Sequence, residues 1–268
     1  MIQRLLAAGL GLLLVIPAVV FGGEIAVEIL VPIAMSICLF EYASMAFPRA
    51  RNAAMLLIGL GIAALYVPLL YVPWLGVALP AAGVLVGAMV TTTVFPGDDL
   101  SQAADRLGRG LVGIGWILLL AFLVLIRRLD GGLGWVFLIL AISWCGDTGG
   151  YFAGRFFGRT PLYPRISPKK TWEGVGGAIT LSVVGVFAVR ALGLPQLPVV
   201  PALALGVGSC ALGILGDLAE SMLKRAFQVK DSGILLPGHG GILDRIDSVM
   251  FVAPAVFLVA ALIQGGGA

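Results

Sequence analysis

Charged side chains are scarce in this sequence of 268 residues, because only 12% of them are Asp, Glu, Lys or Arg. A soluble domain of this size needs about 25% charged residues to cover its surface. The sequence is also 60% hydrophobic and has a mean hydropathy of +1.07. This composition argues against an ordinary soluble protein and predicts a chain that is mostly surrounded by lipid.

Cysteine and histidine are scarce too, with three cysteines and one histidine in the chain. Cys38, Cys145 and Cys210 all fall in apolar runs. We interpret them as small buried hydrophobic residues, which argues against a disulfide framework or a cysteine metal cluster. Short segments of alternating polarity, which are typical of membrane β-barrels, are also missing, because the apolar runs are continuous. The sequence therefore predicts an all-α polytopic integral membrane protein.

Nine apolar segments are long enough to cross a hydrocarbon core of about 30 Å at about 1.5 Å per residue. They are predicted at residues 4–22, 25–45, 53–71, 74–95, 110–127, 133–150, 174–193, 198–216 and 247–264. The first is interpreted as a retained helix and not a cleaved signal peptide. Residues 198–230 could form one long helix, and residues 96–109 resemble an amphipathic helix at the interface. No internal repeat is present, so residues 1–268 are predicted to form a single membrane domain.

The basic residues predict the orientation of these spans. With nine spans, 14 of the 17 bases fall on the same side as the N-terminus, and only Arg127, Arg128 and Arg190 fall on the other side. Cytoplasmic loops carry an excess of Lys and Arg. The N-terminus and the basic side are therefore predicted to be cytoplasmic.

Charge is concentrated in one stretch between the last two predicted spans, residues 216–248. This stretch holds five of the 14 acids, four of the 17 bases and the only histidine. A solvated, salt-bridged loop is the simplest alternative for such a run of charges. Acids at the ends of membrane spans are costly when they are uncompensated. This favours a functional site at the cytoplasmic interface.

Two sets of acids in this stretch have helical spacing. Asp217, Glu220 and Lys224 would share one face if the eighth span continues as a helix. Asp244 and Asp247 repeat the spacing at the start of the ninth span. Carboxylates that face a common volume are suitable for Mg²⁺, which binds through a few carboxylates and substrate phosphates.

The bases and glycines between these acids are suitable for binding phosphate. Lys224, Arg225 and Lys230 offer charged donors to phosphate oxygens. In the segment 237–241, Pro-Gly-His-Gly-Gly, glycines would let backbone N–H groups approach an anion closely. His239 is a candidate for proton transfer, and the alternative is that it only positions this loop.

Two further segments are predicted to reach the same side. Ser167, Lys169, Lys170 and Thr171 precede the seventh span and would offer donors to a phosphate at a helix start. The alternative is a basic anchor at the membrane surface. Asp147 ends the sixth span and is a candidate metal ligand or ion-pair partner. The small residues that follow it would also permit close helix packing.

Residues 221–248, SMLKRAFQVKDSGILLPGHGGILDRIDS, resemble the signature of the phosphatidate cytidylyltransferase (CDP-diacylglycerol synthase) family. The matching pattern runs from Ser-x-apolar-Lys-Arg through Lys-Asp and His-Gly-Gly to Asp-Arg-x-Asp. SPKKTWEG at 167–174 and Asp147-Thr148 with Tyr151 also resemble the family. Residues 1–140 match only in being hydrophobic, so the resemblance places the catalytic portion at 141–268.

The resemblance implies transfer of the cytidylyl group of CTP to phosphatidate, with one or two Mg²⁺ ions and a monovalent cation as a further candidate. It implies a homodimer in the cell (inner) membrane, and no nucleic acid partner is expected. The candidate metal ligands are Asp217, Asp244, Asp247, Glu220 and Asp147. The candidate catalytic residues are Asp217, Lys224, Arg225, Lys230, Asp244, Asp247 and His239, and the candidate phosphate-binding residues are Ser167, Lys169, Lys170, Lys224, Arg225, Lys230 and Arg245.

Two other functions remain alternatives. A CTP-dependent lipid kinase of the polyprenol type would release CDP in place of pyrophosphate. A transporter would require polar groups near the middle of the bilayer, whereas the charges here gather at one interface.

Overall fold

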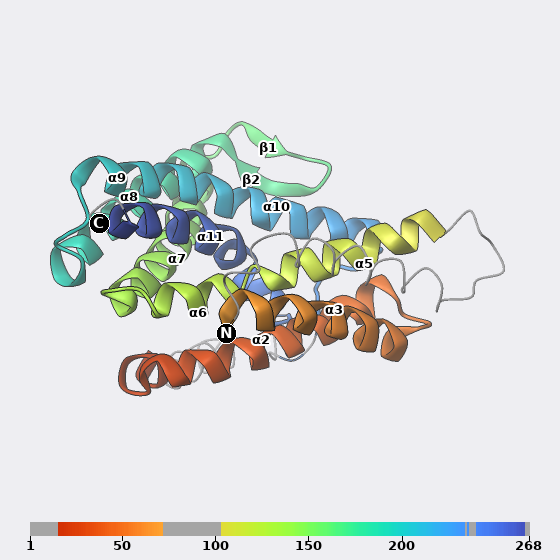
Figure 1. Cartoon of the computed structure of the whole chain (residues 1–268). Helices are drawn as coiled ribbons and strands as arrows, with labels where there is room; N and C mark the ends of the chain where they lie inside the picture. The colour runs from red at the N-terminus through yellow and green to blue at the C-terminus, as the bar shows by residue number, and fades with distance from the viewer. Residues whose placement is uncertain (1–15, 72–102, 234, 236–239, 266–268) are drawn as a thin grey trace.

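The computed structural model describes residues 16–71, 103–233, 235 and 240–265, and within these ranges the chain is almost entirely helical (Figure 1). Among these described residues, seven helical segments are long and apolar enough to cross a membrane. They are formed by α2 (Gly23–Ala46), α3 (Arg51–Tyr71), α5 (Ala103–Leu118) with α6 (Ala121–Arg127), α7 (Gly132–Phe157), α8 (Trp172–Gly193), the segment from α9 (Val199–Ala204) to α10 (Cys210–Ala226), and α11 (Leu243–Gly265).

Each of these seven segments matches a predicted span. The predicted span 74–95 and most of the predicted span 4–22 lie outside the described residues. The predicted long helix after residue 198 is confirmed as far as Ala226, and it includes one π-helical turn, η3 (Leu205–Ser209). The prediction of a separate interfacial helix over 96–109 is wrong for its described part, because residues 103–109 are the first turns of α5.

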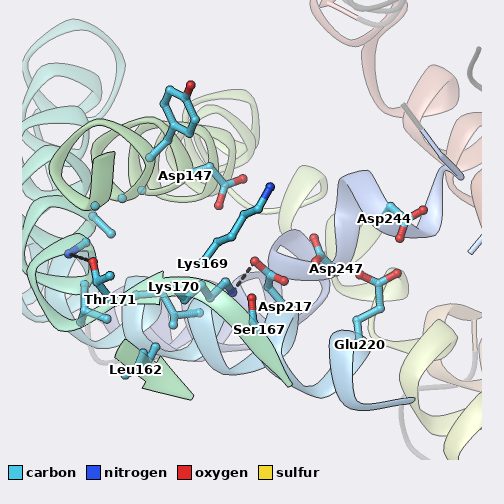
Figure 2. A pocket seen from close by; sticks show the side chains of 18 of the residues that line it. Asp147, Leu162, Ser167, Lys169, Lys170, Thr171, Asp217, Glu220, Asp244 and Asp247 are labelled. Carbon is cyan, nitrogen blue, oxygen red and sulfur yellow. Dashed lines mark hydrogen bonds and ion pairs between the residues drawn. The ribbon is translucent and has the colours of Figure 1, made fainter. Parts of the chain in front are cut away.

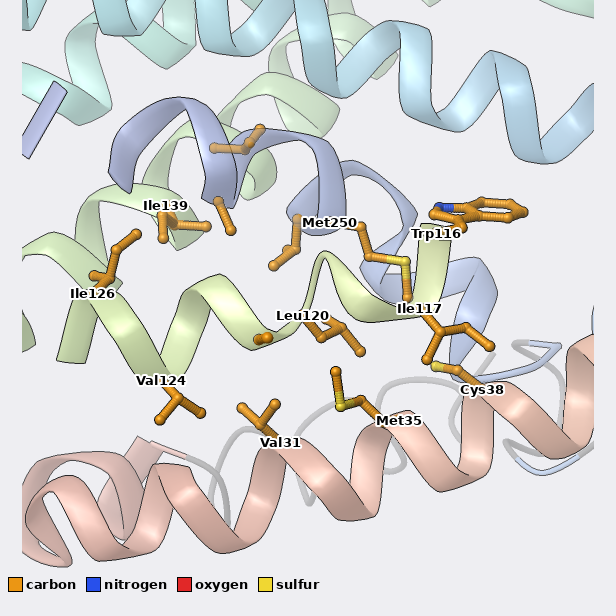
Figure 3. Packing of buried hydrophobic residues seen from close by; sticks show 14 of the residues in the cluster. Val31, Met35, Cys38, Trp116, Ile117, Leu120, Val124, Ile126, Ile139 and Met250 are labelled. Atoms are coloured by element: carbon orange, nitrogen blue, oxygen red, sulfur yellow. The ribbon is translucent and has the colours of Figure 1, made fainter. Parts of the chain in front are cut away.

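The helices form two groups with α5 and α6 between them. Helices α2 and α3 lie on one side, and α7 to α11 lie on the other (Figure 1). The core between the groups is apolar: Met35 of α2 and Met250 of α11 approach Leu120 from opposite sides (Figure 3). All three side chains are at most 5% exposed. This packing brings the N-terminal helices against the last helix of the chain.

Helices α7 and α8 pack closely because small residues face each other. A Cβ atom added at Gly149 would lie 2.3 Å from the carbonyl oxygen of Gly177, and one added at Gly177 would lie 2.2 Å from the Cβ of Ala153. The predicted close packing after Asp147 is thus confirmed.

A β-hairpin connects α7 to α8. Strand β1 (Pro161–Tyr163) pairs antiparallel with β2 (Ser167–Thr171). Glu173 accepts hydrogen bonds from the backbone N–H groups of Arg159 and Thr160, at 3.1 and 3.2 Å, and this fixes the start of the hairpin against α8. The prediction that Lys169 and Lys170 occupy a helix start is therefore wrong. They lie on β2, and only Thr171 caps α8, by accepting a hydrogen bond from the Gly174 N–H.

Polar contacts join different helices at the two ends of the bundle. At one end, Arg109 of α5 donates to the carbonyl oxygen of Ala46 at 2.9 Å, and its guanidinium lies 5.2 Å from the centre of the Phe227 ring. At the other end, Arg128 binds Glu28 of α2 and the carbonyl oxygen of Leu70. Span ends that were predicted to lie on the same side of the membrane are therefore in contact with each other.

Candidate active site

A cavity of about 660 Å³ lies at the end of the bundle where the hairpin is found. Its walls come from α7, the hairpin, α8, α10 and α11, all within the C-terminal part of the chain. The labelled acidic and basic side chains project into it from opposite walls (Figure 2). Segments predicted separately at 147–151, 167–174 and 217–247 thus contribute to one site.

Six acidic residues line this cavity, namely Asp147, Asp217, Glu220, Asp231, Asp244 and Asp247. Asp147 comes from α7, Asp217 and Glu220 from α10, and Asp247 from α11. The predicted shared face of Asp217, Glu220 and Lys224 is confirmed, because all three line the cavity. Glu220 is 1% exposed and Asp247 is 7% exposed. Several carboxylates held close together out of water require cations to balance them.

Lysine side chains supply part of this balance. Lys170 of β2 forms an ion pair with Asp217 (Figure 2). Lys224 lies between two acids, with its Nζ 2.5 Å from an oxygen of Asp244 and 3.1 Å from an oxygen of Glu220. Lys169 extends into the space between Asp147 and the acids of α10 and α11 (Figure 2). The cavity therefore presents ammonium groups among its carboxylates.

Asp244 differs from the other acids because the protein itself occupies both of its oxygens. Oδ1 contacts Lys224, while Oδ2 accepts hydrogen bonds from the N–H of Ser232 at 2.9 Å, the Ser232 hydroxyl at 2.9 Å and the N–H of Gly241 at 2.8 Å. Gly240 has a φ of 82°, which glycine adopts without strain. In this arrangement Asp244 fixes Lys224 and the loop before α11.

The remaining acids are suitable ligands for a divalent cation whose coordination a bound substrate would complete. Among the described residues, no three Asp, Glu, His or Cys side chains form a preassembled metal site. However, Oε1 of Glu220 is buried and has no hydrogen-bond partner, and Asp217 and Asp247 line the same cavity. Mg²⁺ commonly uses one or two carboxylates, several waters and substrate phosphates. The donor set therefore fits Mg²⁺ without a closed protein cage.

Most of the predicted site residues meet at the cavity, and some do not. Asp147, Ser167, Lys169, Lys170, Asp217, Glu220, Lys224, Asp244, Arg245 and Asp247 line it. Arg225 and Lys230 are exposed and are not among its lining residues. His239 lies outside the described residues, so its predicted role is not tested.

Three polar lining residues were assigned no role from the sequence. Tyr151 and Arg155 line the cavity because α7 continues to Phe157, past the predicted end of that span, and Arg155 donates a hydrogen bond to the Tyr151 hydroxyl at 2.7 Å. Their spacing of four residues was the available signal. Asp231 also lines the cavity, and it lies inside the motif that carried the resemblance.

Comparison with known proteins identifies relatives of this chain. The model of the cytidylyltransferase family matches residues 2–263. A protein of Bacillus subtilis named phosphatidate cytidylyltransferase is 42% identical over 142 residues, which cover 53% of this chain and 53% of that protein. Proteins of the same name from Mycobacterium tuberculosis and Pseudomonas aeruginosa are 40% identical over 134 residues and 39% identical over 165 residues. These alignments cover 50% and 60% of this chain, and 40% and 58% of the respective relatives.

The chain spans about half the length of the curated relatives it matches. The family model, in contrast, covers nearly every residue from the first predicted span to the last. The chain belongs to the cytidylyltransferase family.

Proposed function

We propose that this chain transfers the cytidylyl group of CTP to phosphatidate, giving CDP-diacylglycerol and pyrophosphate. The observation that carries the proposal is the convergence of the signature residues Lys224, Asp244 and Asp247 with Lys170 and Asp147 around one cavity. The names of the relatives support the same reaction. The position of the cavity at the end of the spans is suitable for joining a lipid phosphate to a soluble nucleotide.

In the proposed reaction an oxygen of the phosphatidate phosphate attacks the α-phosphorus of CTP. A new phosphorus–oxygen bond forms, and the bond between the α-phosphorus and the bridging oxygen to the β-phosphate breaks, so that pyrophosphate leaves with the electron pair. The attacking phosphate is already anionic near neutral pH, so a strong general base is not needed. The main barrier is bringing two polyanions together, which positioning and charge neutralisation lower.

The residues that line the cavity provide this positioning and charge neutralisation with hydrogen-bond donors held in defined positions. Lys224 is held by Glu220 and Asp244, so its ammonium group has a defined position. Lys169, Lys170, Ser167 and Arg245 line the same cavity and would contact phosphate oxygens. Arg225 and Lys230 are not among the lining residues, so we assign them no contact with the triphosphate.

Asp217, Glu220 and Asp247 would hold Mg²⁺, with Asp147 as a further ligand from the opposite wall. When bound, the ion neutralises phosphate charge in the transition state. In the absence of substrate, the ion pair of Lys170 with Asp217 keeps that carboxylate compensated. Lys170 would turn to a phosphate when the nucleotide enters.

We further propose that the cavity faces the cytoplasm, because 14 of the 17 bases fall on that side of the predicted topology. The resemblance also leads us to propose a homodimer in the cell (inner) membrane. Chemical crosslinking in intact membranes would detect the dimer, and a purely monomeric pattern would contradict it.

The reaction is tested with the purified full-length chain, phosphatidate and Mg²⁺, using CTP labelled in either the α- or the γ-phosphate. The proposal predicts that the α-label enters the lipid and the γ-label appears in pyrophosphate. A lipid kinase would instead place the γ-label in the lipid and release CDP. Solute flux in proteoliposomes without CTP turnover would indicate a transporter, and either result would contradict the proposal.

A further inference from the structure

Glu41, near the end of α2, is a buried acid outside the cavity. Its side chain is 2% exposed, although it lies about 200 residues before the site in the chain. Oε1 accepts a hydrogen bond from the N–H of Ile242 at 2.9 Å, and Oε2 accepts one from the N–H of Leu243 at 2.8 Å. The Ser232 hydroxyl lies 3.2 Å from Oε2. The N-terminal half of the chain thus holds the start of α11.

The location of these bonds explains why a buried carboxylate is tolerated there. The first N–H groups of a helix have no partner within the helix, and the helix dipole favours a negative charge at this end. Backbone donors in the glycine-rich loop were predicted to bind a substrate anion. Of that segment, residues 237–239 lie outside the described residues, and the N–H of Gly241 donates to Asp244. The next two N–H groups, of Ile242 and Leu243, donate to Glu41, so these donors bind the protein's own carboxylates.

Ser232 connects Glu41 to the cavity. Its hydroxyl lies between Glu41 and Asp244, at 3.2 and 2.9 Å, and its backbone N–H donates to Asp244. Asp244 in turn contacts Lys224, which lines the cavity. A chain of polar contacts therefore runs from α2 to the ammonium group that we assign to the triphosphate.

Two glycines leave just enough space for the Glu41 carboxylate. A Cβ atom added at Gly233 would lie 2.7 Å from Oε1, and the three nearest atoms that it would meet all belong to Glu41. A Cβ atom added at Gly241 would lie 2.3 Å from Oε2 and 2.1 Å from the Ser232 hydroxyl. Because two backbone N–H groups bind this carboxylate and the Ser232 hydroxyl lies against it, it has little freedom to move aside.

We propose that Glu41 is a positioning residue for catalysis. By binding residues 242–243 and Ser232, it fixes the loop that orients Asp244, and Asp244 orients Lys224 toward the nucleotide. The role in catalysis rests on the proposed cytidylyl transfer, whereas the loop contacts do not. Glu41 touches no substrate in this proposal.

The test is a double-mutant cycle of Glu41→Ala, Gly233→Ala and the pair together in the full-length chain, with Glu28→Gln as a control on the same helix. KM for CTP and kcat are measured per folded enzyme. We expect Glu41→Ala to raise KM for CTP or lower kcat by about tenfold, the size of one charge-assisted hydrogen bond. Gly233→Ala should act in the same direction, because its methyl group displaces the carboxylate.

The double variant should be no worse than Glu41→Ala alone, because the added methyl group then has no carboxylate to displace. Glu28→Gln should retain the wild-type KM for CTP. Additive losses in the cycle, or wild-type kinetics for Glu41→Ala, would overturn the proposal. If Glu41→Ala does not fold, Glu41→Gln is the second variant, because it keeps the shape of the side chain but replaces one of the two oxygens that accept from Ile242 and Leu243 with an amide nitrogen. An unchanged KM and kcat in that variant would also overturn the proposal.

Hydrogen exchange separates this proposal from the proposed function. The amides of residues 241–243 should exchange at least about tenfold faster in Glu41→Ala than in the wild type, because two of them lose their acceptors. Unchanged exchange would refute the loop contact whatever the reaction is. A wild-type chain that transfers no cytidylyl group would refute the proposed function and leave the exchange result standing.

Discussion

The two ends of the bundle use charge in different ways. At one end, the Nε and Nη2 atoms of Arg128 donate to Glu28 at 2.9 and 2.6 Å, and Nη1 donates to the carbonyl oxygen of Leu70 at 2.8 Å. The guanidinium also lies 5.1 Å from the centre of the Tyr71 ring. Every nitrogen of this guanidinium has a partner from α2 or the end of α3, so the group joins these helices.

At the other end, the acids of the cavity outnumber the lysines that balance them. Asp147, Asp217, Glu220 and Asp247 share one volume, and Oε1 of Glu220 is buried without a hydrogen-bond partner. The comparison teaches that opposite charges gathered between helices do not by themselves identify a ligand site in this chain. Charged groups that are incompletely paired beside an open cavity do identify such a site, because a bound cation or phosphate would complete their pairing.

Substitution of a cavity acid should have the largest effect on activity. Asp247→Asn removes a carboxylate charge that we assign to Mg²⁺ binding, so turnover should fall about a thousandfold. The measurement is cytidylyl transfer at saturating CTP over a range of Mg²⁺ concentrations. Loss of a metal ligand should lower turnover far more than about threefold. If turnover stays within about threefold of the wild type, Asp247 is not a metal ligand.

Removal of a cavity lysine should have a smaller effect. Lys170→Ala should raise KM for CTP by roughly 10- to 100-fold, because a hydrogen bond to a charged group contributes about 1.5–3 kcal/mol. Initial rates over a series of CTP concentrations measure the change. An unchanged KM would mean that Lys170 only compensates Asp217 and does not contact the nucleotide.

Disruption of the Arg128–Glu28 pair at the other end of the bundle should affect stability more than turnover. Arg128→Leu leaves Glu28 without its partner and should lower the free energy of unfolding by about 2 kcal/mol, since the pair is partly exposed. Thermal unfolding in detergent detects the loss, and kcat per folded enzyme should stay near the wild-type value. A large fall in kcat with unchanged stability would show that this end takes part in the reaction.

The smallest effect is expected beside the cavity. Arg225→Ala removes an exposed base that does not line it, so KM for CTP and kcat should change by less than about twofold. Lys224→Ala, one residue earlier, is the matched comparison and should be strongly impaired. Equal losses in the two variants would contradict the division between cavity and surface.

Local patterns predicted much of this molecule. Hydropathy placed all seven described spans, because about 20 apolar residues are needed to cross a bilayer. Helical spacing brought Asp217, Glu220 and Lys224 to one wall. The same spacing could not separate Lys224 from Arg225 until the orientation of α10 was known, since neighbouring residues point in different directions around a helix.

Features that depend on tertiary contacts were not predicted. The hairpin carrying Lys169 and Lys170 is short and polar, so it has no hydropathy signal. Glu41 finds its partners in the segment 232–243, about 200 residues later in the chain. Spacing within a helix carries no information about such a contact, and the sequence left Glu41 unassigned.

The location of the nucleotide is tested most directly by protection from thiol labelling. Ser167→Cys places a thiol on the cavity wall and Arg225→Cys places one outside it, each in a chain whose native Cys38, Cys145 and Cys210 are replaced by alanine. Saturating CTP with Mg²⁺ should protect the thiol at position 167 and leave the one at position 225 fully reactive. Equal labelling at position 167 with and without CTP would show that the nucleotide binds elsewhere.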